Sequence, residues 1–367
     1  MFKTKPAVFA AGKNYHIMVP VNCETLMWVR VGDKCFYNEK NGVLCSKPLI
    51  HHMVVPMELL DKEKSYTICA RKIIRRLAYF TETEDVEEFT FDFKPVCGEW
   101  IRAYHIADTH GQVEEPVSAA KTYGDIDLLI LNGDIPNSSE SVNDILVVYK
   151  IAEAITGGNI PIIFSRGNHD LRGEKAELFA DCTPCDNGNS YYTVRLGDIW
   201  MLVLDCGEDK ADDRIEYGHT ICCHDFRLRE TAFIESVIAN AENEYLADGI
   251  KRKIIIAHDP FTFPKKPHFN TEEKIYRHWA ELIRENIKPD MMLCGHTHQN
   301  GIFEVGGEKD ALGQPCIMVV GGEPKQYEPV IPGVSTYNGV GISVSENGIE
   351  AEFTSNSGKI LSSHKIL

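Results

Sequence analysis

The chain has 367 residues, of which 43% are hydrophobic and 25% are charged. These proportions are typical of a soluble globular protein and exclude a largely disordered chain. The formal net charge of -16, from 38 Lys+Arg and 54 Asp+Glu, argues against a broad nucleic-acid-binding surface, because such a surface needs clustered cations.

No targeting segment is predicted at the start of the chain. The apolar stretch before Gly12 and Lys13 is shorter than the apolar region of a signal peptide, and no segment is long and apolar enough to span a bilayer. The 12 cysteines follow no regular framework, as is typical of a reducing compartment. We therefore expect a cytoplasmic protein that has no membrane partner.

Residues 14 to about 96 consist of short β-type runs separated by turns. Aromatic and β-branched residues dominate these runs, for example at residues 15–21 and 26–31. Several short strands at this spacing indicate a sandwich, and no helix is predicted among them. We predict a small all-β domain, similar to an immunoglobulin or fibronectin-III domain, over residues 1–97.

Beyond Pro95, strand-like and helical segments alternate, which is the signature of α/β layering. We predict this second domain over residues 98–367. After residue 301 the chain returns to strands, including a hairpin across Glu346-Asn347-Gly348. The predicted helices are 142–155, 228–246 and 271–286, and the predicted strands before residue 301 are 100–107, 127–131, 161–165, a pair within 191–204, 253–257 and 291–294.

Polar side chains follow five of these strands at the point where each strand ends. In layered α/β sheets ligands bind outside the carboxyl ends of the strands, so these side chains are predicted to converge on one pocket. Glycines at positions 133, 167 and 295 allow the tight turns that this requires. The five clusters are Asp108-Thr109-His110, Gly133-Asp134, Gly167-Asn168-His169-Asp170, His258-Asp259-Pro260 and Gly295-His296-Thr297-His298.

These residue types predict a metal centre. One such cluster alone is most often an ordinary turn, but five at successive strand ends are hard to produce by chance. Imidazole together with carboxylate suits Mn, Fe or Zn, and the absence of thiolates argues against a purely structural zinc site. The seven candidate ligands are too many for one ion, so two metal ions that share a bridging carboxylate are expected.

The ordered set D-x-H, G-D, G-N-H-D, H and G-H-x-H resembles the calcineurin-like metallophosphoesterase superfamily over roughly residues 99 to 300. The resemblance implies a four-layer αββα sandwich with a di-metal site at the strand ends. It also implies that Asp134 bridges the two ions. By the same resemblance, the ligands of one ion would be Asp108, His110 and His298, and those of the other Asn168, His258 and His296.

His169 would not be a ligand but would assist the leaving group beside the substrate phosphate. The expected reaction is hydrolysis of a phosphomonoester or small phosphodiester, by attack of a hydroxide that both ions activate. A small phosphate ester is therefore the expected partner. Arg172, Asn137 and His219 are weaker candidates for substrate contacts.

Two departures narrow the resemblance. The N-terminal sandwich is reminiscent of purple acid phosphatases, but those enzymes have glycine at the position of His110 and a tyrosine ligand at that of Asn137. We therefore expect no phenolate-iron colour. Protein Ser/Thr phosphatases resemble this chain less. Their motif differs from it after Gly133, where the sequence of this chain is D-I-P-N-S-S.

Two other functions stay open at this point. One is a nuclease of the same fold, which the acidic composition disfavours; nucleic acid is not an expected partner. The other is a metal-binding scaffold without turnover, which the complete set of ligand positions disfavours.

Overall fold

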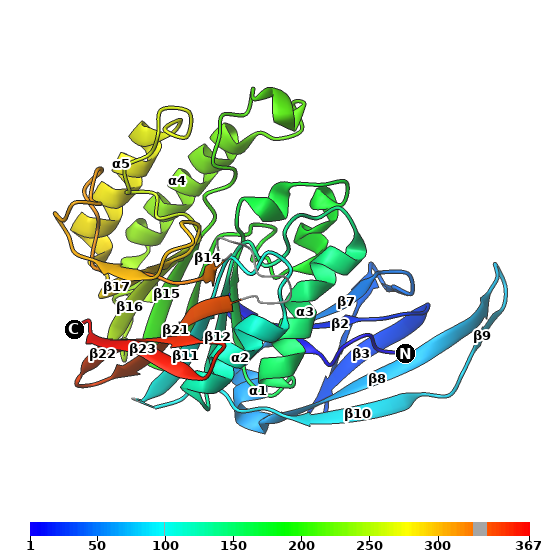
Figure 1. The fold of residues 1–367 in the computed structure, drawn as a ribbon. Coiled ribbons are helices and arrows are strands. Elements are labelled where there is room, and N and C mark those ends of the chain that lie inside the picture. The colour runs from blue at the N-terminus through cyan, green and yellow to red at the C-terminus, as the bar shows by residue number, and fades with distance from the viewer. Residues whose placement is uncertain (99, 326–335) are drawn as a thin grey trace.

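Two large sheets lie face to face at the centre of the molecule (Figure 1). The computed structural model describes residues 1–98, 100–325 and 336–367. In the first sheet, nine of the described strands follow the order β23-β22-β21-β11-β12-β13-β1-β2-β7, and β20 pairs with β21. Strands β11, β12, β13 and β1 run parallel to one another. The bounds are β1 Ala7–Ala11, β2 Asn14–Pro20, β7 Ile50–Pro56, β11 Ile101–Ile106, β12 Leu128–Asn132, β13 Ile162–Ser165, β20 Glu323–Lys325, β21 Thr336–Ser345, β22 Gly348–Ser355 and β23 Lys359–Lys365.

The second sheet has the order β14-β15-β16-β17-β19-β18. Its central strands β15, β16, β17 and β19 are parallel, so their carboxyl ends share one edge. The bounds are β14 Tyr192–Leu196, β15 Ile199–Leu204, β16 Arg252–Ala257, β17 Met291–Cys294, β18 Gly301–Phe303 and β19 Met318–Val320.

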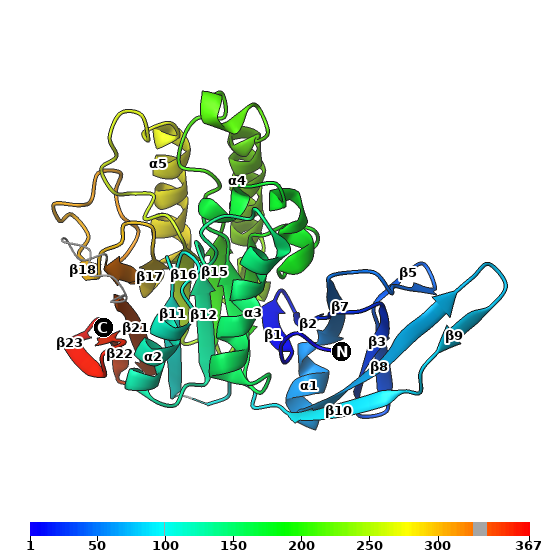
Figure 2. The same ribbon diagram turned by 45° about the vertical axis from the view of Figure 1, so that its right-hand side comes forward.

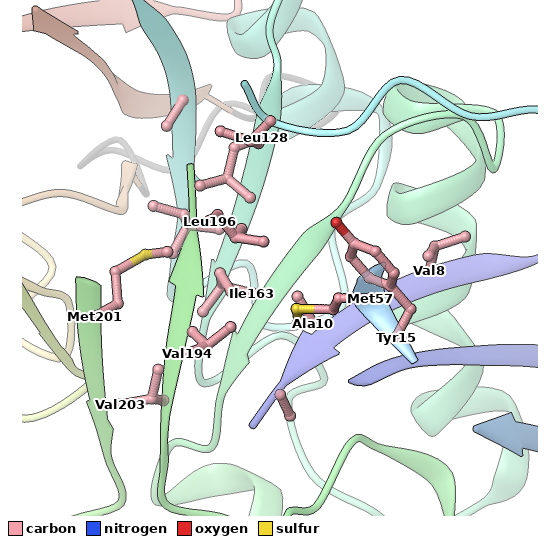
Figure 3. Packing of buried hydrophobic residues seen from close by; sticks show 14 of the residues in the cluster. Val8, Ala10, Tyr15, Met57, Leu128, Ile163, Val194, Leu196, Met201 and Val203 are labelled. Carbon is pink, nitrogen blue, oxygen red and sulfur yellow. The ribbon is translucent and has the colours of Figure 1, made fainter. Parts of the chain in front are cut away.

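Each central strand is buried on both faces, and alternate residues face different layers. In β12, Leu128 and Ile130 pack toward the second sheet, whereas Leu129 and Leu131 pack against helices. Figure 3 shows part of the core between the sheets, where Ile163 lies near Val194 and Leu196 of the second sheet.

Helices cover the outer faces of both sheets. Helices α2 (Glu114–Tyr123) and α3 (Val142–Thr156) pack on the first sheet. Helices α4 (Cys223–Ala239) and α5 (Glu273–Leu282) pack on the second, and α5 continues as a π-helical turn over Ile283–Ile287. The predicted αββα architecture is confirmed.

The N-terminal strands form a β-sandwich, as predicted. A third sheet, of order β10-β8-β3-β4 with β9 paired to β8, shares a buried core with β1, β2 and β7. The bounds are β3 Thr25–Val31, β4 Lys34–Tyr37, β8 Ser65–Arg76, β9 Thr81–Thr83 and β10 Glu87–Asp92, and a small separate pair is β5 Glu39–Lys40 with β6 Val43–Leu44.

One sheet of this sandwich is continuous with the first large sheet. Strand β1 pairs in parallel with β13 at Phe9 and Ile162, so hydrogen bonding crosses from the N-terminal strands to the strands that follow residue 100. Figure 2 shows β1 beside α3, while β8 and β9 extend away from the helical layers. A domain boundary at residue 97 stays a prediction.

The helices differ from the sequence prediction in three places. Helix α1 (Met57–Glu63) interrupts the region where no helix is predicted; it is too short for a clear periodic pattern, although its residues favour helix. Helix α2 is likewise not predicted. Helix α4 begins five residues before the predicted position and ends before Leu246.

The remaining helical segments are single 3₁₀ turns, at His169–Leu171, Ala176–Leu178, Ala180–Cys182, Ile215–Tyr217 and Ala241–Asn243. Across the described residues, none of the helices is both long enough and apolar enough to cross a bilayer.

Candidate metal centre

The carboxyl ends of strands β11, β12 and β13 meet those of β16 and β17 at one edge of the two sheets. Three overlapping groups of ligand atoms lie there, and within each group the atoms are within 4.8 Å of one another. Asp134 and His110 each belong to two groups, so the groups form one continuous centre. The groups are Asp108, His110 and His298; His110, Asp134 and His169; and Asp134, His258 and His296.

The first group joins the ends of β11 and β17. The Nε2 atoms of His110 and His298 are 2.9 Å apart. Asp108 Oδ1 lies 3.4 Å from His298 Nε2 and 4.0 Å from His110 Nε2. Asp108 is fully buried, so its charge is paired by groups of the centre itself.

The third group joins the ends of β12, β16 and β17, and Asn168 after β13 lies beside it. Asp134 Oδ2 lies 3.2 Å from His258 Nε2. The side-chain amide of Asn168 lies 3.0 Å from His296 Nδ1 and 3.3 Å from Asp134 Oδ2. His258 Nε2 is also 3.8 Å from Asp108 Oδ1. The first and third groups therefore lie side by side.

The backbone of the loops turns these side chains inward. Five of the candidate ligands adopt the left-handed conformation, which is uncommon for residues other than glycine and gathers at functional sites. The φ angles are 54° at Asp108, 46° at His110, 53° at Asp134, 68° at His296 and 53° at His298.

Gly133 is required where the loops cross. A Cβ atom at this position would lie 2.6 Å from Gly167 N and 2.6 Å from His258 Nδ1, so the backbone and the imidazole leave no space for a side chain. Its φ of 78° also favours glycine. The glycine therefore permits the loops after β12 and β13 and the side chain at the end of β16 to come together.

The donor atoms have the unfilled interactions that a cation would satisfy. Asp108 Oδ1 and His258 Nε2 are buried and have no hydrogen-bond partner among the described residues. Buried polar atoms are rarely left unpaired, and a cation would satisfy both, so the residues fit divalent metal ions.

Buried neighbours hold two of the loops in place. His258 Nδ1 donates to Asn132 O at 2.7 Å, which leaves Nε2 directed at the centre, as is usual for histidine ligands. Asp170 Oδ2 accepts hydrogen bonds from Gly167 N at 2.7 Å and Asp134 N at 3.3 Å. Asp170 therefore links the loops after β12 and β13.

Electrostatics in the centre favour positive charge. Burial alone would lower the pKa of His258, but the carboxylates of Asp134 and Asp108 raise it to about 10. Burial lowers the pKa of His110 to about 4, and the neighbouring carboxylate of Asp108 raises the pKa of His298. A metal ion must displace the proton of His258, so binding would release protons and weaken as the pH falls.

His169 lies beside the centre but both of its ring nitrogens have partners. Its Nδ1 donates to the backbone oxygen of Asn137 at 2.8 Å, and its Nε2 lies 3.0 Å from Arg172 Nη1. Its backbone N–H donates to Asp134 Oδ1 at 2.8 Å. The backbone of Asn137 orients His169, while the Asn137 side chain is exposed.

Arg172 is fixed by Glu208, a residue that the sequence prediction does not include. Its Nε and Nη2 atoms bind the two carboxylate oxygens of Glu208 at 2.5 and 2.8 Å, and Tyr217 donates its hydroxyl to Glu208 at 2.7 Å. Glu208 is fully buried. Burial alone would raise the pKa of Glu208, but the hydrogen bonds from Arg172 and Tyr217 lower it.

The sequence contains a pattern that could have identified Glu208. This residue lies in Asp205-Cys206-Gly207-Glu208-Asp209, a sixth polar cluster at a strand end, which follows β15. His219 is exposed beyond Tyr217, and across the described ranges its ring has no hydrogen bond to the centre. A substrate contact by His219 stays a prediction.

Two cavities adjoin the centre. One has a volume of about 660 Å³ and is lined by Arg172, Lys210 and Tyr217 together with four glutamates. The other has a volume of about 470 Å³ and is lined by His296 and Thr297 together with lysine and phenylalanine side chains. Both volumes suit a small organic ligand.

Comparison with known proteins shows the family. Residues 101–300, more than half of the chain, match the calcineurin-like phosphoesterase family. The chain belongs to this family. As a calcineurin-like phosphoesterase it is a phosphoester hydrolase, and the family uses divalent metal ions. None of the curated proteins matches the chain significantly.

The solved structures that match the chain include a plant phosphatase and a protein from an amoeba. A purple acid phosphatase, PPD1 from yellow lupin (Lupinus luteus) seeds, aligns with 99% of this chain and 73% of its own, at 14% identity and a TM-score of 0.60. A single mutant of Vps29 from Entamoeba histolytica aligns with 72% of this chain and 98% of its own, at 10% identity and a TM-score of 0.34. Wild-type Vps29 from the same organism, complexed with zinc, aligns with 73% of this chain and 100% of its own, at 10% identity and a TM-score of 0.36.

The likeness to the lupin phosphatase spans the N-terminal strands as well as the metallophosphoesterase domain, because it covers almost the whole chain. The predicted resemblance to purple acid phosphatases is therefore confirmed for the fold.

Proposed function

We propose that this calcineurin-like phosphoesterase hydrolyses a phosphomonoester or small phosphodiester with two metal ions, of which Mn, Fe and Zn are the candidates. The observation that carries the proposal is the convergence of carboxylate and imidazole side chains from five strand ends on one partly buried centre. When bound, two such ions would supply positive charge to phosphate oxygens and lower the pKa of water.

We assign the ligands by proximity. One ion would be held by the group around His298, and the other by the group around His258, with Asp134 between them. The 3.8 Å between His258 Nε2 and Asp108 Oδ1 supports two neighbouring ions. The first set is Asp108, His110 and His298, and the second is Asn168, His258 and His296.

His169 and Arg172 would act on the substrate from the side. Both ring nitrogens of His169 are already engaged, which supports a role other than metal binding. Arg172 Nη1 lies beside His169 Nε2, so one phosphate oxygen or the leaving oxygen could contact both groups. Hydrogen bonds from charged donors to a transferred phosphoryl group stabilise its developing charge.

The test combines metal analysis with a substrate panel. The purified protein is loaded with Mn, its metal content is measured, and phosphomonoesters and phosphodiesters are compared. We expect about two ions per chain and hydrolysis of at least one ester class. Two bound ions without hydrolysis of any ester would instead favour a metal-binding scaffold.

Two variants separate metal binding from turnover. Asp134→Asn should lower metal content and reduce kcat/KM by at least about 100-fold. His169→Ala should retain the metal and lose turnover by about 100-fold or more. His364→Ala, an exposed histidine of β23, serves as the control with unchanged activity. Normal turnover by Asp134→Asn at matched metal loading would contradict the assignment.

A further inference from the structure

The smaller cavity beside the centre has an unusual lining for so acidic a chain. It begins at His296 and Thr297 and extends over the segment that follows His258. Its volume of about 470 Å³ lies within the range of small-molecule sites. Besides the two residues of the metal centre, it is lined by Asp209, Asp259, Pro260, Phe263, Pro264, Lys265, Lys266, Phe269, Gln299 and Lys309. We call it the lysine groove.

The acidic residues of the lysine groove already have cationic partners within the protein. Asp259 is buried and accepts a hydrogen bond from Lys265. Asp209 Oδ1 lies 3.3 Å from Arg172 Nη2. Both carboxylates therefore have a cationic partner within the protein, and Asp209 shares Arg172 with Glu208.

Two lysines of the groove remain without acidic partners. Lys266 and Lys309 are exposed, and neither forms an ion pair with any residue in the described ranges. They come from different segments, one after β16 and one after β18, and both segments border the groove. In a chain of net charge -16, this is a local excess of positive charge next to the metal centre.

The larger cavity, beside Arg172, has the opposite character. Its lining includes Glu140, Glu174, Glu177 and Glu216. Its lysine, Lys210, lies 2.7 Å from Glu216, and its arginine is held by Glu208. An anionic group would be repelled from that side, so it would be directed to the lysine groove.

The wall of the lysine groove also offers apolar contact. Phe263 is largely buried and its ring centroid lies 4.8 Å from that of Phe303. Phe269 is half-buried, and the Lys210 ammonium lies 5.8 Å from the centre of its ring. A carbon skeleton that joins two anionic groups could pack on these rings.

We propose that the lysine groove binds a second anionic group of the substrate, so that the substrate class is a phosphate ester that carries a further phosphate. This proposal rests on the proposed function for the first phosphate, which the metal centre would hold. Lys266 and Lys309 are then specificity-determining residues. They would contact the second phosphate without taking part in hydrolysis.

The test compares one anion that fills the metal centre with one that also reaches the groove. Orthophosphate and inorganic tripolyphosphate are titrated into the Mn-loaded protein by calorimetry at fixed free Mn, and both are tested as inhibitors of p-nitrophenyl phosphate hydrolysis. In the double variant Lys266→Ala/Lys309→Ala, the Kd of tripolyphosphate should rise at least about 10-fold, whereas that of orthophosphate should stay within about 2-fold.

Matched variants complete the design. Lys34→Ala, at an exposed lysine of β4, should change neither the Kd of tripolyphosphate nor that of orthophosphate. Lys266→Arg/Lys309→Arg keeps both charges and should therefore retain tripolyphosphate binding. An equal effect on both anions, or none, would overturn the groove assignment. Absence of p-nitrophenyl phosphate hydrolysis in the wild type would instead count against the proposed function, and calorimetry would still decide the groove.

Discussion

At the scale of single residues, the side chains around His169 depend on a buried carboxylate. Glu208 binds Arg172 through two hydrogen bonds, and Arg172 in turn lies 3.0 Å from His169 Nε2. Bidentate pairs between arginine and carboxylate fix geometry as well as charge. Glu208 is therefore a positioning residue that acts on the centre through Arg172.

Glu208→Gln should release Arg172 from this position. We expect kcat/KM to fall by about 10- to 100-fold while the metal content is unchanged, because Glu208 contacts Arg172 but no candidate ligand side chain. Steady-state kinetics and metal analysis measure the two quantities. Glu216→Gln, in the wall of the cavity that Arg172 also lines, is the control with near-normal activity. Loss of metal from Glu208→Gln would contradict a purely positioning role.

At the scale of elements, Asn132 joins strands of both large sheets beneath the centre. It is fully buried at the end of β12. Its side-chain amide group lies 2.9 Å from His105 Nε2 of β11 and donates to Ala257 O of β16 at 3.3 Å and Leu293 O of β17 at 3.2 Å. Its backbone oxygen holds His258.

Asn132→Ala would leave several buried acceptors without a donor. We expect the free energy of unfolding of the metal-free protein to fall by about 3 kcal/mol, since each unpaired buried group costs about 1–3 kcal/mol. Urea unfolding measures the change. Asn286→Ala, at an exposed amide, should change it by less than about 0.5 kcal/mol. A small effect of Asn132→Ala would show that the strands do not depend on this link.

Helix α4 starts earlier than its sequence indicates because its cap is distant in the chain. Asp212 accepts hydrogen bonds from the backbone N–H groups of Cys223 at 2.9 Å and His224 at 3.0 Å. Asp212→Ala should therefore lower the free energy of unfolding by about 1 kcal/mol. Asp213→Ala is the neighbouring control, and equal stability of the two variants would argue against the cap.

At the scale of the whole molecule, buried histidines should make the fold sensitive to acid. Burial lowers the pKa of His16 to about 3, that of His51 to about 4 and that of His105 to about 3. An unfolded histidine has a pKa near 6.5, so the unfolded chain binds more protons between that value and about pH 4. The contribution of these neutral histidines to the free energy of unfolding is therefore fully present above pH 6.5, and it is lost as the pH falls below that value.

Each such histidine should contribute a slope of about 1.4 kcal/mol per pH unit in this window. Urea unfolding of the metal-free protein at pH 7 and at pH 5 would reveal the loss. His51→Asn keeps an acceptor for Asn38 but cannot titrate. It should therefore reduce the pH slope of the free energy of unfolding by about the contribution of one histidine. A slope equal to that of the wild type would show that His51 is not protonated on unfolding.

Most of the central strands and the candidate ligands could be predicted from the sequence. The apolar runs of β12 and β16 and the glycine turns that lie beside the ligands are local features, and the αββα fold came from the family that these motifs resemble. The pairing of β1 with β13 could not be predicted, because nothing in residues 7–11 specifies a partner about 150 residues away.

The sequence by itself determined which polar residues stand at the strand ends, because strand periodicity and turn residues act between near neighbours. Only the tertiary structure decided what supports them. Glu208 binds Arg172, and Asn132 binds β16 and β17. Lys266 and Lys309, from segments that are distant in the chain, line one groove. Such contacts depend on how the two sheets pack, and no local pattern records that packing.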